Sequence, residues 1–240
     1  MELHQFLADF LPNPPVYQAG FGSLRHLLHP RFQGYEYGIA FARKLDDRIL
    51  DAVAAADGPT QEYFELYNAV NRELSEVAQR VAAALREEGV DALAIGPTPT
   101  EGLDRSPDFS ATLRQRFSHK MAATRAGLGW IGKTDLFVST QFGPRVRLAT
   151  VLTAQPLTEP AAPIDESRCG ACMLCVERCP AQAANGRLWS IRVDRDEFYD
   201  ASKCQQTANR LSLERINENI RICGICVSVC PHGKSTGDHA

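Results

Sequence analysis

Apolar positions along the first part of the chain alternate between two spacings, which predicts strands and helices in turn. The continuous apolar run 37–42 is typical of a buried strand, and the acids Asp46 and Asp47 open a helix expected over 49–55. Gly58 and Pro59 end that helix. From Thr60, a candidate N-cap, apolar side chains recur at steps of three and four up to Gly89. We assign this stripe to the core: Tyr63, Tyr67, Val70, Leu74, Val77, Val81 and Leu85.

Shorter elements follow the long helix. Residues 90–95 predict a strand, 96–100 a loop, and 118–126 a helix that ends at Gly127. Two further strands are expected over 136–139 and 146–153, and we predict that they form a hairpin around residues 142–144. The first 160 residues therefore predict an α/β domain.

The cysteines lie in the last third of the chain. All 8 fall between Cys169 and Cys230. The first run has the spacing C-x2-C-x2-C-x3-C-P, in which three thiolates bind one 4Fe-4S cluster and the fourth binds a second cluster. The second run, 223–231, keeps C-x2-C-x3-C-P, and Cys204 can supply its missing first ligand.

This spacing predicts a crossed ligation of two clusters. The first cluster set is Cys169, Cys172, Cys175 and Cys230, and the second cluster set is Cys204, Cys223, Cys226 and Cys179. Zinc and disulfides are the alternatives, because C-x2-C serves both. Three cysteines at steps of three, with a proline after each run, favour iron-sulfur clusters.

Composition places the chain among ordinary globular proteins. The formal net charge is −3, and no apolar run approaches the roughly 20 residues of a membrane span. The N-terminal residues include acids and lack the pattern of a secretory signal. We therefore expect a cytoplasmic protein with no membrane partner, in a reducing compartment that suits thiolate ligands.

One stretch departs from this charge balance. Residues 113–147 carry seven lysines and arginines against a single acid, Asp135. Such a local field can hold an anionic cofactor or substrate, and a solvated basic face is the alternative. Within it, three glycines of the loop 127–133 surround Trp130, and glycine lets a backbone approach a ligand closely. The loop follows a helix and not a strand, which argues against a dinucleotide site.

The loop 126–133, the Phe142-Gly143 turn and the double cysteine run together resemble the epoxyqueuosine reductases and, more distantly, the reductive dehalogenases. The resemblance runs from about Arg125 to Pro231. It implies a nitroreductase-like corrinoid-binding α/β domain over 1–160 that holds base-off cobalamin, followed by a ferredoxin-like double-cluster module over 161–240. It also implies that the loop and two arginines contact the corrinoid: Gly127, Leu128, Gly129, Trp130, Ile131, Gly132, Lys133, Arg145 and Arg147.

The activity that this resemblance implies is a two-electron reduction of a small or nucleoside-like substrate, with an external electron donor such as a ferredoxin or flavodoxin. His119 is the candidate proton donor because histidine titrates near neutral pH, and a structural histidine is the alternative. The place of the acid that the family carries before the loop falls near Leu113 here, so this chain lacks that acid. The net charge and the few residues after Cys230 predict that tRNA does not bind tightly.

Two other hypotheses belong to different classes of protein. The chain can be an electron-transfer or corrinoid-reactivating iron-sulfur protein without a small-molecule substrate of its own. It can also be a cluster-binding module whose N-terminal part binds no corrinoid. The sequence does not decide between these hypotheses and the enzyme.

Overall fold

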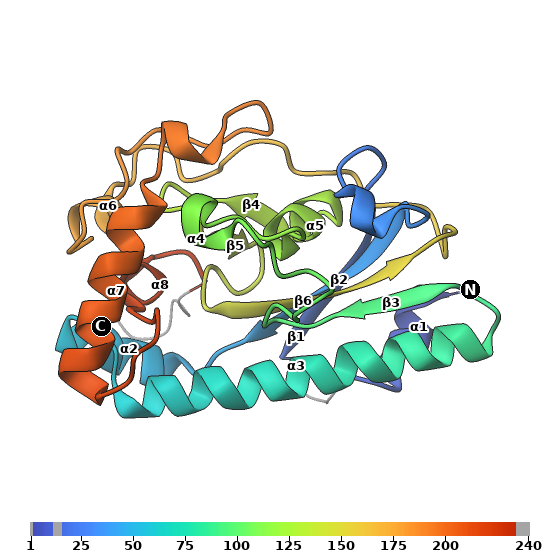
Figure 1. Ribbon diagram of the computed structural model, residues 1–240, viewed down its shortest axis with the longest axis horizontal. Coiled ribbons are helices and arrows are strands. Elements are labelled where there is room, and N and C mark those ends of the chain that lie inside the picture. Colours follow the sequence, from blue (N-terminus) through green and yellow to red (C-terminus); the bar gives the residue numbers. More distant parts are fainter. Residues whose placement is uncertain (1, 12–15, 234–240) are drawn as a thin grey trace, which may run out of the picture. The chain divides into compact units, whose positions relative to one another are not determined.

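The larger of two sheets has the strand order β1-β2-β6-β3. The computed structural model describes residues 2–11 and 16–233 and is shown in Figure 1. β1 (Tyr17–Ser23) pairs antiparallel with β2 (Tyr37–Lys44), with Phe21 opposite Ile39. β3 (Ala92–Ile95) pairs antiparallel with β6 (Val146–Thr153). The strand predicted over 37–42 is thus confirmed, as are those near 90–95 and 146–153.

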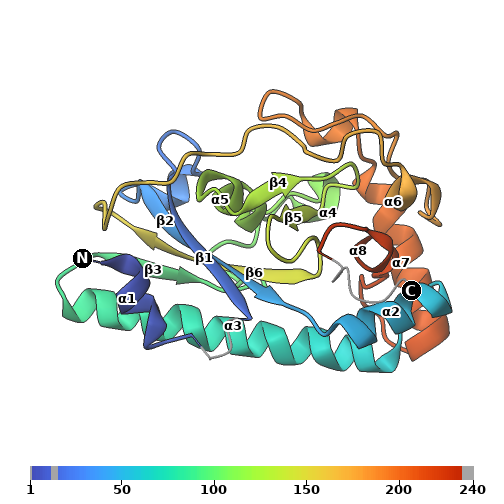
Figure 2. The same ribbon diagram turned by 180° about the vertical axis from the view of Figure 1, so that it is seen from behind.

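Helices lie on both faces of this sheet. α3 (Gln61–Glu87) runs along one face and α5 (His119–Arg125) lies on the other, as both views show (Figures 1 and 2). The Thr60 hydroxyl accepts a hydrogen bond from the Tyr63 N–H at 3.2 Å, and Gly89 adopts a φ of +78° after the last turn of α3. The predicted core stripe is buried except for Tyr67, which is half-buried.

The C-terminal end of α5 approaches strand β1 closely. A Cβ on Gly22 would lie 2.5 Å from the carbonyl carbon of Arg125, so β1 accepts only glycine at this position. Six fully enclosed side chains form a core cluster beside these elements: Leu24, Phe32, Ile95, Phe117, Ala122 and Leu152. α1 (Leu3–Ala8), α4 (Phe109–Thr112) and the 3-10 turn Pro30–Phe32 complete this part of the fold.

The remaining elements carry the cysteines. They are α2 (Asp47–Ala56), β4 (Gly129–Ile131), β5 (Phe137–Ser139), α6 (Leu174–Glu177), the 3-10 turn Arg195–Glu197, α7 (Ala201–Ile216) and α8 (Ile225–Val229). α8 packs against α2 and α6. The Asp46 carboxylate accepts from the Arg48 N–H at 2.8 Å, which caps α2 at the predicted place.

The predicted hairpin between 136–139 and 146–153 is wrong. β5 pairs with β4 in a separate two-stranded sheet, while β6 lies between β2 and β3. The turn closes before β6 begins, because Ser139 and Gly143 exchange backbone hydrogen bonds of 2.8 and 3.0 Å. The sequence also did not predict β4, in which Gly129, Trp130 and Ile131 of the glycine loop form a strand.

Contacts divide the chain into two compact units that interleave along the sequence. The first comprises the residues up to Lys44, Ala69–Leu128 and Arg147–Ile164; the second comprises Leu45–Asn68, Gly129–Val146 and the residues from Asp165 on. A division by contacts does not show which parts of the chain fold on their own. The predicted domain boundary near residue 160 therefore stays a prediction. The fold is mixed α/β, as predicted. Among the described residues, we find no helix with the length and apolar character that crossing a bilayer requires.

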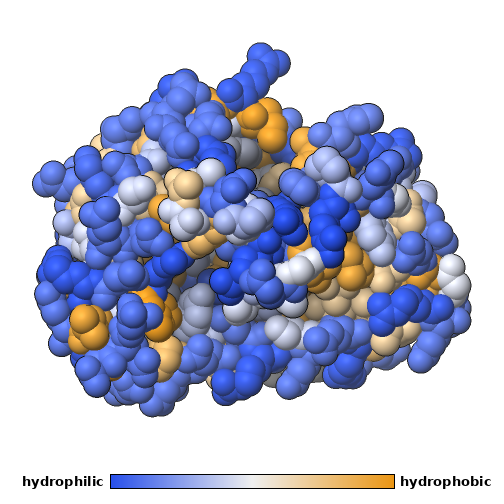
Figure 3. Space-filling model, in the orientation of Figure 1, coloured by the Kyte–Doolittle hydropathy of each residue, from blue (hydrophilic) through white to orange (hydrophobic). Residues whose placement is uncertain are grey.

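The surface is largely hydrophilic on the face shown in Figure 3, with hydrophobic side chains in several separate patches. Leu174, Leu188 and Ile191 are among the exposed apolar side chains of the second unit. Isolated apolar side chains on a surface are ordinary in folded proteins and indicate no function by themselves.

Candidate metal centre

All eight cysteines belong to the second compact unit, and all eight thiols are free. Cys169 and Cys172 lie on the loop before α6, Cys175 on α6 and Cys179 just after it. Cys204 lies on α7, Cys226 lies on α8, and Cys223 and Cys230 flank α8. The cysteines that the spacing predicted as ligands are therefore brought together by the fold.

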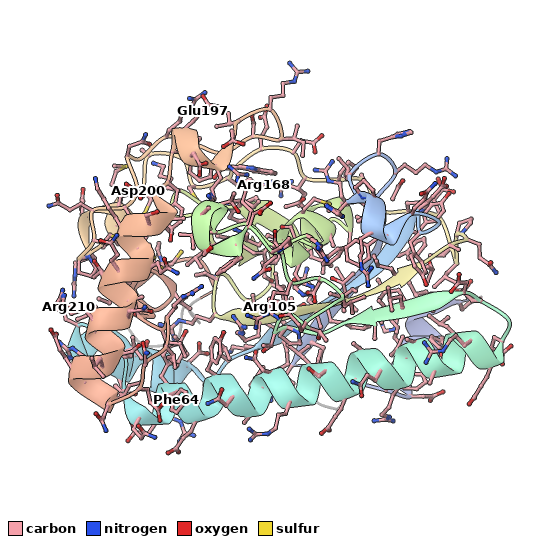
Figure 4. The ribbon with its side chains drawn as sticks, in the orientation of Figure 1. Phe64, Arg105, Arg168, Glu197, Asp200 and Arg210 are labelled. Carbon is pink, nitrogen blue, oxygen red and sulfur yellow. The ribbon has the colours of Figure 1, made fainter. Side chains whose placement is uncertain are left out.

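Local structure fixes the ligands of the second cluster set. The Asp200 carboxylate, labelled at the start of α7 in Figure 4, caps the helix by accepting from the Lys203 N–H at 3.0 Å. Cys204 follows near the start of the same helix. Gly224 precedes α8 with a φ of +84°, and a Cβ there would lie 2.7 Å from the Tyr63 ring. Glycine is thus required between Cys223 and the helix that carries Cys226.

The electrostatic neighbours of the thiols follow the crossed pattern. Burial raises the pKa of Cys230 to about 11, and its charged-thiol neighbours are Cys175, Cys169 and Cys172. Burial likewise raises the pKa of Cys223 to about 11, with Cys204 and Cys179 as its neighbours. Each set therefore contains one cysteine from the other run, as the two Cys-Pro sequences predict.

The two sets lie next to each other. Burial holds the pKa of Cys226 well above its usual value, and its neighbours include Cys175 of the first cluster set besides Cys223, Cys204 and Cys179. Among residues 2–11 and 16–233, no three His, Cys, Asp or Glu side chains converge on one point as ligands of a single ion do. A 4Fe-4S cube binds each thiolate to a different iron, so its ligands need not converge in that way.

Three side chains outside the cysteine runs contact the thiols. The Trp130 indole N–H lies 3.4 Å from the Cys169 sulfur. Burial raises the pKa of Cys175, and the hydrogen bond that the Thr134 hydroxyl donates to this thiol lowers it. Burial raises the pKa of Tyr199, and the hydrogen bond that its hydroxyl donates to Cys204 raises it further. Sequence reasoning missed Thr134 and Tyr199, since no spacing rule connects a distant hydroxyl to a thiol.

The glycine loop faces the first cysteine run. Gly132 approaches Cys169, because a Cβ on it would lie 3.6 Å from the sulfur. The Lys133 ammonium is 4% exposed and donates to the Cys172 carbonyl at 2.9 Å. A Cβ on Gly129 would lie 2.0 Å from the Val138 carbonyl oxygen, so this glycine permits close strand pairing. These close approaches are to protein atoms.

The other residues predicted to contact a corrinoid also have protein partners. Leu128 and Ile131 are buried, and Gly127 lies beside residues 161–162. The Arg147 Nε donates to the Asn71 side chain at 2.9 Å in the first unit. Gly127, Leu128 and Arg147 belong to the first unit, and the remaining six belong to the second.

Arg145 connects two helices of the second unit. Its guanidinium is 1% exposed and pairs with Asp47 at 3.0 Å and Asp51 at 2.6 Å. It also donates to the Ser228 carbonyl at 2.9 Å, on the helix that carries Cys226. The Nε atom of Arg145 is buried without a partner among the described residues. Arg145 therefore positions α8 against α2.

His119 has two partners in the first unit. Its Nδ1 lies 2.9 Å from the Thr150 hydroxyl and its Nε2 lies 2.9 Å from the Gly96 carbonyl. Because a carbonyl only accepts, Nε2 carries the proton and Nδ1 accepts from Thr150. Burial lowers the pKa of His119 to about 4, the Gly96 carbonyl opposes this, and the Arg147 charge lowers it further. This geometry matches the structural alternative, and the role of proton donor stays a prediction.

Leu113 and the buried acid Asp104 both belong to the first unit. Leu113 ends α4 in a left-handed conformation with a φ of +51°. Asp104 is buried, its carboxylate accepts from the Thr100 N–H at 2.7 Å, and burial raises its pKa. This carboxylate closes a loop of the first unit.

Residues 168–233 match the family model of the 4Fe-4S double cluster binding domain, which includes all eight cysteines. An epoxyqueuosine reductase of Lactococcus garvieae is 35% identical over 124 residues, covering 49% of this chain and 32% of that protein. The chain resembles the epoxyqueuosine reductases. It spans about a third of the length of the curated relatives it matches.

Solved structures show the same fold. A reductive dehalogenase, whose structure is described as suggesting a mechanism for B12-dependent dehalogenation, has a TM-score of 0.64 at 18% identity, covering 91% of this chain and 30% of that one. An epoxyqueuosine reductase solved with an epoxyqueuosine-modified tRNA stem loop has a TM-score of 0.60 at 18% identity, covering 99% of this chain and 66% of that one. At this identity the likeness concerns the fold alone.

Proposed function

We propose that the chain is an iron-sulfur oxidoreductase of the epoxyqueuosine reductase-like type, which holds two 4Fe-4S clusters on the two cysteine sets. The observation that carries the proposal is the gathering of eight free thiols in one compact unit, in two sets that exchange Cys179 and Cys230. Each cluster carries one electron, so the pair matches a two-electron reduction. The substrate class is a small or nucleoside-like molecule, and a reduced ferredoxin or flavodoxin supplies the electrons.

Cobalamin enters this proposal from the relatives. A solved reductive dehalogenase of similar fold is described as B12-dependent, and a nitroreductase-like domain over 1–160 would hold base-off cobalamin in this chain. When bound, cobalamin supplies a low-valent cobalt for the reduction. Of its nine predicted contact residues, Gly129, Lys133 and Arg145 lie against protein atoms. The corrinoid contacts therefore stay a prediction.

The tRNA prediction has no support from the comparisons. An epoxyqueuosine reductase of similar fold has been solved with a tRNA stem loop, so weak tRNA binding by this chain stays a prediction. The cytoplasmic location stays a prediction as well. Of the alternatives, the electron carrier without a substrate is not favoured, because the curated relatives are named as reductases.

The experiment that tests the proposal is the analysis of anaerobically purified protein. We expect about eight iron and eight sulfide per chain, and a paramagnetic resonance spectrum of two interacting clusters after reduction. Adding cobalamin to the same sample should change the cobalamin absorption spectrum. Stoichiometric zinc in place of iron would contradict the clusters, and an unchanged cobalamin spectrum would remove cobalamin from the proposal while the clusters stand.

A further inference from the structure

The two cysteine sets have different polar surroundings, and the first cluster set has the more positive ones. The Trp130 N–H points at the Cys169 sulfur at 3.4 Å, and the Thr134 hydroxyl donates to Cys175. The buried Lys133 ammonium lies at the Cys172 carbonyl and also contacts the Met173 sulfur at 3.3 Å.

A second cation lies above the indole. The Arg168 guanidinium carbon is 5.9 Å from the centroid of the Trp130 ring, and Arg168 directly precedes Cys169 in the chain (Figure 4). The His232 ring also contacts the indole, edge to face, with the ring centroids 5.2 Å apart. Two side chains therefore pack on Trp130, whose indole N–H is directed to the thiol.

The second cluster set has one hydroxyl donor and a mixed charge. The Tyr199 hydroxyl donates to Cys204, and the Asp135 carboxylate acts on both Tyr199 and Cys204. Arg215 opposes this anion from the side of Cys223. Asp135 and Arg215 thus act on the second cluster set with opposite signs, whereas Lys133 and Arg168, near the first cluster set, are both positive.

Reduction places an extra negative charge on a cluster and its thiolates. Hydrogen bonds to the sulfurs and nearby cations stabilise that charge and raise the reduction potential, while a nearby carboxylate lowers it. Both effects are strongest where the sulfurs are shielded from water, because the low local dielectric there screens them less than water does. In the first cluster set Cys230 is buried, and Cys169, Cys172 and Cys175 are partly exposed.

We infer that the cluster on the first cluster set has the higher reduction potential of the two, and that the Trp130 N–H and the Asp135 carboxylate set much of the difference. The inference rests on the two clusters of the proposed function. A reduced ferredoxin or flavodoxin that gives up one electron is oxidised by one electron, and that electron would come to rest on the first cluster. The first cluster is the one beside the segment Gly129–Lys133, so electrons collect there.

The test is a potentiometric titration of the reconstituted protein, followed by paramagnetic resonance. We expect two one-electron steps. Trp130→Phe keeps an aromatic ring and removes the indole N–H. It should lower the higher of the two reduction potentials by about 40 mV, which is roughly fivefold in the redox equilibrium, and leave the lower potential unchanged. Trp189→Phe is the matched control, because Trp189 is the other tryptophan of the unit and is equally buried.

A second variant probes the other set without depending on the first. Asp135 has a φ of +58°, which asparagine tolerates well, so Asp135→Asn removes the charge at little structural cost. This variant should raise the lower reduction potential and so narrow the difference between the two potentials. The inference is overturned if Trp130→Phe shifts the lower reduction potential or shifts neither potential. It is also overturned if Asp135→Asn leaves both potentials unchanged. Protein with fewer than two clusters would overturn the proposed function instead.

Discussion

The indole N–H of Trp130 lies 3.4 Å from the sulfur of Cys169, although the two residues are 39 positions apart in the chain. β4 carries this tryptophan, and the pairing of Trp130 with Val138 of β5 holds the strand in place. Gly129 lets the two strands approach, since its missing Cβ would fall 2.0 Å from the Val138 oxygen. The short β4–β5 sheet thus serves as a support for the first cluster set.

We predict that Gly129→Ala damages this support. The added carbon cannot fit without moving the strand, so the free energy of unfolding should fall by about 3 kcal/mol and the signal of the first cluster should weaken. Chemical denaturation and paramagnetic resonance measure the two effects. Gly34→Ala is the control: its φ is +101° with open space around it, so it should cost only the backbone strain of about 1 kcal/mol. A normal first-cluster signal in Gly129→Ala would contradict the supporting role.

The crossed ligation predicts where two cysteine substitutions act. Cys230→Ser removes a thiolate from the first cluster set although its neighbours in sequence belong to the second, and Cys179→Ser does the reverse. Each variant should retain about half of the iron. Cys230→Ser should lose the first cluster and Cys179→Ser the second, because a missing ligand exposes one iron to water. Iron analysis and paramagnetic resonance of both variants decide this. Loss of the cluster on the same run would show uncrossed ligation.

Arg145 should be important for stability, and not for binding an anion. Arg145→Lys cannot reach Asp47, Asp51 and Ser228 together, because lysine lacks the planar fork of arginine. We expect a loss of about 2 to 4 kcal/mol in the free energy of unfolding, and faster release of iron to a chelator. Arg48→Lys is the matched control, since Arg48 is 92% exposed in its pair with Asp46 and surface pairs contribute little. Equal stability of the two variants would refute the positioning of α8 by Arg145.

Much of the site could be predicted from sequence because its information is local. The spacing of Cys169, Cys172 and Cys175 within one run determines which thiolates can share a cube. The helix starts at Asp46 and Thr60 could likewise be predicted, because a helix cap depends on neighbours within one turn.

The surroundings of the clusters could not be predicted, because they depend on pairing between distant segments. The strand Gly129–Ile131 is too short for a periodic signal, so the sequence does not show that Gly129 permits close strand pairing. The family resemblance, together with the charge of their stretch, predicts that Lys133 and Arg145 contact a cofactor. Which partner a buried cation finds is decided by tertiary structure, and both found protein oxygens.

His119 allows a prediction about pH. Its pKa in the folded protein is about 4, below the usual 6.5, so the unfolded chain binds the extra proton between these values. Stability should therefore be complete above pH 6.5 and fall as the pH drops from 6.5 toward 4, by up to about 1.4 kcal/mol per pH unit from this group. His119→Gln can keep the hydrogen bond to the Gly96 carbonyl and removes the titration, so this part of the slope should disappear. His4→Gln, at an exposed histidine, should leave the slope as it is. If His119→Gln instead keeps the wild-type slope while abolishing substrate reduction at pH 7, the histidine acts on the substrate and the structural assignment fails.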